Sequence, residues 1–269
     1  FVGYRGYDRG DIRLLVARDM STSSEMPLNS LSISTSFERY GVDGFKLANL
    51  FRFLEKGALP PKTETNAMSL GVWRSEGERM LFGDNEVSFL KSGRADFSKF
   101  YWLVPTEMSF LAEGGVYKVA ALIDFLTTTG AIGVDDSAAV EVKQMLSRYS
   151  EALEKFDMLT ISFDGDFESH WNPESGAAGA SANISLADLA DIEEKVEVAA
   201  PNFEAFSGLA PKDDGQIDWE AVKSLLTEGA ALKHFNLGVR DDGGVAKGFG
   251  LAVEFAKLAP EDDQQAAML

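Results

Sequence analysis

Hydrophobic and polar residues alternate with a period of two along several stretches of the chain. The longest alternation runs from Leu159 to Trp171, with apolar residues on one face and mostly polar or charged residues on the other. One buried and one solvated face is typical of a strand in an antiparallel sheet. Turn-forming residues follow at Asn172–Gly176, and a second alternation then runs to Leu186. We therefore predict a β-hairpin from Leu159 to Leu186. Its predicted core positions are Ile161, Phe163, Phe167 and Ile184.

Shorter alternations predict further strands along the rest of the chain. They occupy residues 12–16, 31–37, 80–82, 87–89, 108–110 and 235–239. Many of these segments are bounded by Gly, Asp or Asn. Such a series of short strands and turns predicts a meander-like antiparallel sheet.

Helical periodicity lies between the predicted strands. The predicted helices cover residues 45–54, 119–128, 135–156, 219–227 and 245–258. Two stretches, 31–57 and 232–258, share the order strand, turn, helix. This order hints at a duplicated unit, although the identities are too few to define a repeat.

Together these elements predict an α+β fold. We expect a curved, meander-like antiparallel sheet with helices packed on its apolar face. Residues 1–269 are expected to form one large domain. Two similar halves meeting near residues 105–135 are the alternative organisation, and residues 260–269 are expected to fray.

The charge of the chain excludes one class of partner. It carries 43 Asp and Glu against 25 Lys and Arg, which gives a formal net charge of −18. This excess repels nucleic acid and anionic headgroups, and the basic residues form no block that offsets it. No apolar stretch approaches the roughly 20 residues that a membrane-spanning helix needs. We therefore expect no nucleic-acid partner and no transmembrane segment in this chain.

Candidate catalytic and metal-binding residues are scarce. The chain has no cysteine, which removes thiol chemistry and cysteine metal sites. Its two histidines, His170 and His234, lie on the polar faces of predicted strands, without a serine or acid at a catalytic spacing. No histidine pair at helical spacing indicates zinc, and no complete glycine-rich phosphate motif occurs. We expect no catalytic residues, no metal site and no cofactor.

Three carboxylates share the polar face of the longest predicted strand. Asp164, Asp166 and Glu168 are spaced about 7 Å apart along a strand. Paired carboxylates can act as acid and base in glycoside hydrolysis. A solvated strand face is the simpler interpretation. A carboxylate-dependent hydrolase is therefore retained as an alternative function.

The densest aromatic run of the chain is the candidate binding element. It comprises Phe100, Tyr101, Trp102 and Leu103, followed by Val104 and Pro105. Large aromatic side chains suit both protein cores and ligand clefts. We predict these four residues as ligand-binding, with core packing as the competing interpretation.

Several segments of the sequence resemble those of a known group of proteins. They are Ser69–Gly71, Phe97–Phe100 before Pro105–Glu107, Leu159–Pro173, and Leu232–Asp241 leading into the last helix. Their strand–turn–helix texture resembles that of poorly characterised exported envelope proteins of proteobacteria, whose function is unknown. The resemblance implies a periplasmic location and a non-enzymatic role. It identifies no functional residues.

These observations favour a non-enzymatic periplasmic binding or scaffold protein. Its expected partner is an apolar, lipid-like small molecule or an envelope protein. The alternatives are the hydrolase described above and a structural partner in an envelope assembly. A cytoplasmic location is the alternative to the periplasm, because a chain without cysteine fits either compartment.

Overall fold

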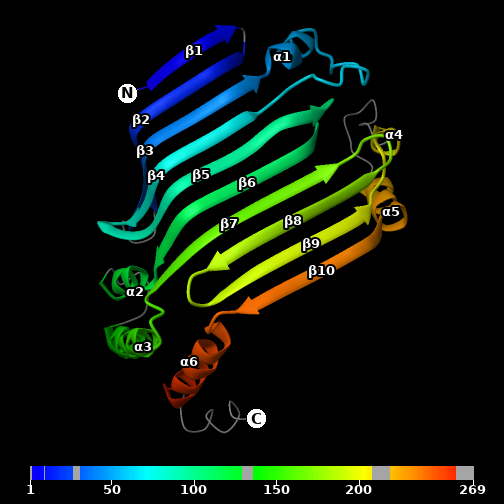
Figure 1. Cartoon of the computed structure of the whole chain (residues 1–269). Coiled ribbons are helices and arrows are strands. Elements are labelled where there is room, and N and C mark those ends of the chain that lie inside the picture. Colours follow the sequence, from blue (N-terminus) through cyan, green and yellow to red (C-terminus); the bar gives the residue numbers. More distant parts are fainter. Residues whose placement is uncertain (1, 9, 27–30, 129–135, 208–218, 259–269) are drawn as a thin grey trace.

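The computed structural model of the chain describes residues 2–8, 10–26, 31–128, 136–207 and 219–258. Its main feature is a sheet of ten antiparallel strands that follow one another in sequence order (Figure 1). The strands are β1 (Val2–Asp8), β2 (Asp11–Met26), β3 (Leu31–Lys46), β4 (Gly71–Phe82), β5 (Asn85–Tyr101), β6 (Val104–Lys118), β7 (Thr160–Trp171), β8 (Ala177–Leu186), β9 (Ala190–Ala199) and β10 (Ala231–Asp241). The predicted α+β class and antiparallel meander are confirmed.

Six helices accompany the sheet in the described part of the chain. They are α1 (Ala48–Leu54), α2 (Val119–Thr128), α3 (Asp136–Lys155), α4 (Phe203–Ser207), α5 (Trp219–Gly229) and α6 (Gly244–Leu258). They lie at the two ends of the strands, with α1, α4 and α5 at one end and α2, α3 and α6 at the other (Figure 1). None of the described helices is both long and apolar enough to cross a lipid bilayer.

The predicted hairpin is present as β7 and β8. Asn172 forms its turn, because its side-chain oxygen accepts hydrogen bonds from the backbone N–H groups of Glu174 and Ser175 at 2.9 and 3.0 Å. Gly176 then takes a positive φ of 73°, a conformation that glycine adopts without steric cost. Local turn chemistry therefore sets this hairpin in the place that the alternation predicts.

Several strands are much longer than their alternating patterns predict. In β6 the pairing register with β7 shifts between Ala112 and Gly115, and Gly114 adopts a φ of 61°. An extra residue of this kind is a β-bulge, which interrupts the period-two pattern while the strand continues. The short pattern at residues 108–110 therefore marks only the centre of a 15-residue strand.

The helix predicted at residues 45–54 begins later than expected. Phe45 pairs with Ile12 as part of β3, and α1 starts only at Ala48. The first N–H group of the helix, that of Ala48, donates to the Asp11 carboxylate at 2.7 Å. This cap comes from β2, far away in the sequence, so the local pattern could not place the helix start.

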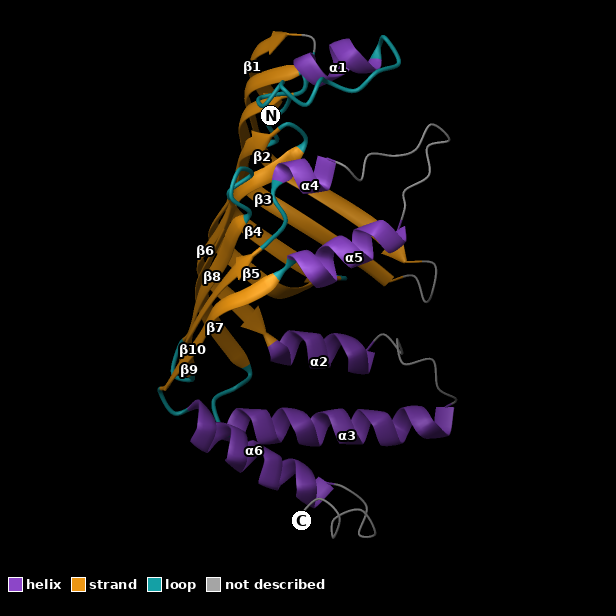
Figure 2. Ribbon diagram, turned by 90° about the vertical axis from the view of Figure 1, so that its right-hand side faces the viewer, coloured by secondary structure: helices purple, strands orange, loops and turns teal. Residues whose placement is uncertain are grey.

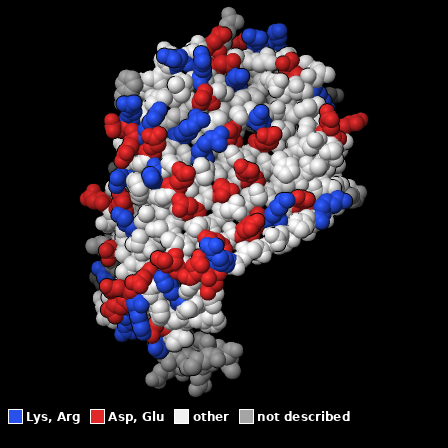
Figure 3. Space-filling model, in the orientation of Figure 1, with Lys and Arg blue, Asp and Glu red and all other residues white. Residues whose placement is uncertain are grey.

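The two faces of the sheet differ in chemistry. Paired residues on neighbouring strands share a face, so the register continues the apolar face of β7 into β6, β8 and β9, where it is mainly apolar but includes Glu194. The opposite face carries Lys, Arg, Asp and Glu side chains spread among uncharged ones (Figure 3). The helices all lie on one side of the sheet (Figure 2). It is the apolar side, because Trp171 of that face donates its indole N–H to Pro201 O beside α4.

The apolar face is only thinly covered. Ile161, Phe163 and Phe167 point to this face as predicted, but they are only half-buried, and Ile184 is 42% exposed. The prediction that these four residues point to one apolar face is therefore confirmed, but none of them is fully buried in a core. The buried hydrophobic residues among those described are Ala17, Val42, Ala48, Ala67, Val87, Ile123, Phe125 and Ala152. A sheet with so small a core leaves its apolar face open over the central strands.

Two expectations about organisation stay predictions. The sheet continues through the region near residues 105–135, where β6 pairs with both β5 and β7. The division into two similar halves remains a prediction. The tail at 260–269 lies outside the described residues.

Candidate functional site

An open groove of about 710 Å³ lies on the apolar face over strands β3 to β8. Its exposed surface is almost entirely apolar. The large apolar side chains that line it are Phe37, Tyr40, Trp73, Leu90, Phe110, Phe163, Phe167 and Ile184. Its volume falls within the range of about 300–1,000 Å³ that is usual for small-molecule sites.

One row of cross-strand neighbours forms the floor of the groove. Trp73 of β4 pairs with Ala95 of β5, which pairs with Phe110 of β6. Phe110 pairs in turn with Phe167 of β7, and Phe167 with Ala182 of β8. The rings of Phe110 and Phe167 lie 5.9 Å apart at a tilt of 50°. Bulky rings thus stand beside alanines in one row, and this difference in size hollows the surface.

A second row depends on a glycine. Gly115 of β6 pairs with Phe163 of β7, whose ring lies directly over it. A Cβ atom at Gly115 would come within 2.4 Å of the Phe163 ring, so no larger residue fits without moving the ring. Gly115 therefore keeps Phe163 lying over the backbone at the side of the groove.

The groove has one polar corner. Glu78 lines it and accepts a hydrogen bond from the Ser75 hydroxyl at 3.2 Å. Tyr40 lies beside them, with its ring edge-on to Trp73 at 5.9 Å. Burial, and next the negative charge of Glu78, raises the pKa of the Tyr40 hydroxyl above its usual value. This corner can donate and accept hydrogen bonds at one end of an otherwise apolar groove.

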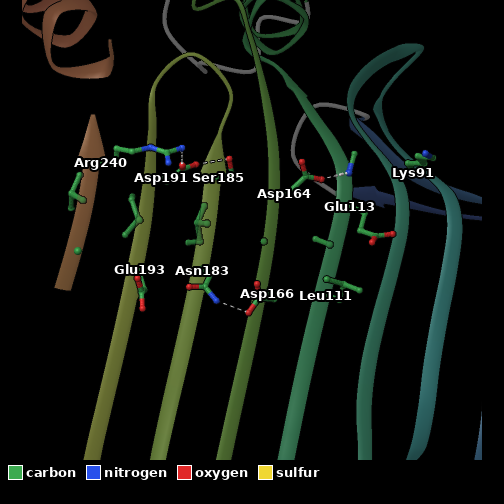
Figure 4. Close-up of a pocket in the computed structure, with 17 residues that line it drawn as sticks. Lys91, Leu111, Glu113, Asp164, Asp166, Asn183, Ser185, Asp191, Glu193 and Arg240 are labelled. Atoms are coloured by element: carbon green, nitrogen blue, oxygen red, sulfur yellow. Dashed lines mark hydrogen bonds and ion pairs between the residues drawn. The ribbon is translucent and has the colours of Figure 1, made fainter. Parts of the chain in front are cut away.

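The polar face carries a hollow of its own, about 1,090 Å³ in volume, over strands β5 to β10 (Figure 4). Asp164 accepts a hydrogen bond from the backbone N–H of Gly114 at 2.6 Å, and Asp166 accepts one from the Asn183 amide at 2.9 Å. Glu168 lines a different, smaller hollow. Although the polar hollow is larger, its carboxylates serve as acceptors within the sheet, and we regard the apolar groove as the better candidate site.

The two histidines are closer in space than the sequence indicates. The register places His170, Gly179, Glu197 and His234 in one row across β7 to β10 on the polar face. A hydrogen bond from Lys195 lowers the pKa of Glu197, and the two histidines contribute in the same direction. Pairing registers over four strands set this row, so no sequence motif reveals it. Within the residues that the structure describes, no group of three His, Asp or Glu side chains could hold a metal ion.

A second cluster on the polar face ties three strands together. Glu86 at the start of β5 accepts from Arg79 of β4 at 2.6 Å and from Lys118 of β6 at 2.7 Å. The hydrogen bond from Lys118, together with that from Arg79, lowers the pKa of Glu86. All three side chains satisfy one another, so the cluster serves the sheet rather than a ligand.

The predicted binding residues Phe100, Tyr101, Trp102 and Leu103 lie at the turn between β5 and β6. Trp102 has a φ of 59° there and donates its indole N–H to Pro60 O at 2.8 Å. The rings of Tyr101 and Trp102 both meet Phe203 of α4 edge-on, at 4.8 and 6.0 Å. The structure thus brings the run together as an anchor for α4 and the loop before β4. None of the four residues is among those that line the apolar groove.

Comparisons of the chain with protein-family models, with curated proteins and with solved structures find no match. The assignment of function therefore depends on the geometry of the chain itself.

Proposed function

We propose that this chain is a non-enzymatic binding protein that holds an apolar, acyl-chain-like molecule in the groove on the apolar face of its sheet. The observation that carries the proposal is the row Trp73, Ala95, Phe110, Phe167 and Ala182, which forms an apolar channel across five strands. Apolar side chains on the central strands of a sheet would normally be covered by a second layer of helices or strands. A bound acyl chain would supply that cover.

Burial of apolar surface can drive such binding without charged contacts. A chain that buries about 400 Å² of apolar surface gains about 10 kcal/mol before the costs of association. Association costs at least about 4 kcal/mol, so at most about 6 kcal/mol remains, which corresponds to a dissociation constant of tens of micromolar or weaker. Because the exposed surface of the groove is almost entirely apolar, the affinity should change little with salt concentration.

The ligand-binding role predicted for Phe100–Leu103 stays a prediction, and the groove is the site we propose. We further propose that the helices pack onto the apolar face and so narrow the groove around its ligand. The contacts of α2 with β5 and β7 support this. A periplasmic location remains part of the proposal, and fractionation of cells that express the full-length protein would test it.

Two adjacent residues of β6 provide a matched test. Phe110 and Leu111 are 42% and 40% exposed, and both border the groove. The register aligns Leu111 with Asp166 and Asn183, which puts its side chain on the polar face. Binding of a fluorescent fatty-acid probe should weaken at least about tenfold in Phe110→Asn, because an amide in an apolar groove costs at least about 1.4 kcal/mol. Leu111→Asn should bind the probe like the wild type.

Circular dichroism would first show that both variants fold. Absence of probe binding to the wild type, or equal weakening by the two substitutions, would contradict the proposal. No observation favours the carboxylate-dependent hydrolase or the structural partner over ligand binding.

A further inference from the structure

β10 is an edge strand of the sheet. β10 is the last strand in the order and pairs with β9 on its inner side. Within the segments that the structure describes, no strand pairs with its outer side. The outward N–H and C=O groups of such an edge are a template for another strand.

The side chains of β10 on the apolar face are unusually exposed. Leu232, Phe235, Leu237 and Val239 are each between 53% and 66% exposed. Their neighbours on the same face of β9, such as Ile192 and Val196, are half-buried. The exposure of these apolar side chains is therefore greatest at the edge, where Glu194 of β9 is also exposed opposite Leu237. Natural proteins usually protect edge strands with inward charges, prolines or short length, and the apolar face of β10 has none of these between Phe235 and Val239.

We propose that β10 pairs antiparallel with β10 of a second copy of this chain, with Leu237 on the two-fold axis. In this register Leu237 faces Leu237 of the second copy, and Phe235 faces its Val239. Lys233, which lies in a β-bulge of β10 and has no partner in β9, then comes opposite Asp241 at each end of the pairing. On the apolar face, apolar residues meet apolar residues at the centre and opposite charges meet at the ends, so this face of the strand is complementary to itself. On the polar face His234 lies opposite Arg240.

Neighbouring registers lose this complementarity. A shift of the two-fold axis by one residue toward Gly238 places Phe235 opposite Asp241. A shift toward Asn236 places Lys233 opposite Val239. Each of these pairs leaves a charge beside an apolar side chain. Asp241 is itself held in place, because it caps α6 by accepting the N–H of Val245 at 2.8 Å.

The pairing would join the two sheets edge to edge. Paired residues of antiparallel strands share a face, so the apolar faces of both copies lie on the same side of the combined sheet. The symmetric pairing also closes on itself, whereas pairing of β10 with the β1 edge of another copy would generate an open-ended array. This inference is independent of the groove and its ligand.

A disulfide test measures the register directly, because the chain contains no cysteine. In the proposed dimer the two Leu237 Cα atoms lie about 4.5–5.5 Å apart, within the range of about 4.4–6.8 Å that a disulfide spans. Leu237→Cys should therefore form a covalent dimer under mild oxidation. Phe235→Cys should not, because the two copies of residue 235 lie about 14 Å apart along the strands. A mixture of Phe235→Cys and Val239→Cys should cross-link.

Val2→Cys on the β1 edge is the control for the other edge, since Val2 is similarly exposed at 67%. Sedimentation of the wild type at about 100 μM should show a dimer, and Leu237→Lys, which sets two like charges face to face, should weaken it at least about tenfold. A wild type that stays monomeric at this concentration overturns the proposal. Cross-linking through Val2 or Phe235 in preference to Leu237 also overturns it.

Discussion

Trp73 and Trp102 satisfy their indole N–H groups in the same way but have different surroundings. Each donates to a backbone carbonyl at 2.8 Å, Trp73 to Leu70 and Trp102 to Pro60. The acceptor of Trp73 lies three residues away, whereas that of Trp102 lies 42 residues away. The Trp102 ring packs against Phe203 of α4, and the Trp73 ring lines the open groove.

The difference separates an anchor from a binding surface. A tryptophan that joins distant segments contributes to folding, and its loss lowers the stability of the whole protein. A tryptophan on an open apolar surface contributes little to folding, and its area remains available for a ligand. The following predictions test whether the two aromatic regions divide their roles in this way.

The largest effect should follow Trp102→Ala. Replacing a buried tryptophan with alanine costs about 3–5 kcal/mol, and the half-buried Trp102 should cost about 3 kcal/mol of the free energy of unfolding. Trp73→Ala should cost about 1–2 kcal/mol, since its hydrogen bond is local and its ring is partly solvated. Urea denaturation of both variants measures the difference. Equal losses would remove the distinction between anchor and groove.

A smaller effect should follow Gly115→Ala. The new methyl group cannot coexist with the Phe163 ring in its present position, so this wall of the groove must move. We expect a loss of about 1–3 kcal/mol in stability and weaker binding of the fatty-acid probe. Gly41→Ala is the matched control, because the nearest atom to its added Cβ is the Leu15 carbonyl oxygen at 3.3 Å and Gly41 does not line the groove. Probe binding that is unchanged in Gly115→Ala would argue against Phe163 as a wall of the groove.

The smallest effect concerns pH and the polar corner of the groove. The pKa of Tyr40 is raised above 10.0 in the folded chain by burial and by Glu78, while the unfolded chain has the ordinary value. Above pH 10 the unfolded state therefore loses this proton first, and the free energy of unfolding falls as the pH rises. Tyr40→Phe should remove that part of the decline above pH 10. Denaturation curves of the wild type and of Tyr40→Phe at pH 8 and pH 11 measure this contribution of Tyr40. An identical decline of the free energy of unfolding in both proteins would contradict it.

Much of the fold is predictable from the sequence, whereas the groove is not. The hairpin of β7 and β8 follows from strict alternation around an Asn–Gly turn, and α2 and α6 follow from helical spacing. The start of α1 depends on a cap from Asp11, which no local pattern contains. The groove takes one or two residues from each of several strands, and only the pairing register brings Trp73, Phe110 and Phe167 together.

The density of aromatic residues in the sequence points instead to the hairpin at Phe100–Leu103. Residues that are adjacent in a turn face different directions, and here Tyr101 and Trp102 pack against Phe203 of α4, far away in the sequence. Residues that form a surface on a sheet alternate with polar ones and lie far apart in the sequence. A compact aromatic run is therefore a weaker signal of a binding surface than single aromatic residues repeated over successive strands.

Fluorescence quenching of Trp73 tests the central claim most directly. The chain contains four tryptophans, Trp73, Trp102, Trp171 and Trp219. One protein would keep only Trp73 and a second only Trp102, with phenylalanine at the other three positions and the fold confirmed by circular dichroism. A brominated fatty acid should quench Trp73 saturably at a concentration of about 100 μM and leave Trp102 unquenched, because contact with bromine requires the ligand to lie in the groove. No quenching of Trp73, or equal quenching of both tryptophans, would contradict the proposal that this face of the sheet binds an acyl chain.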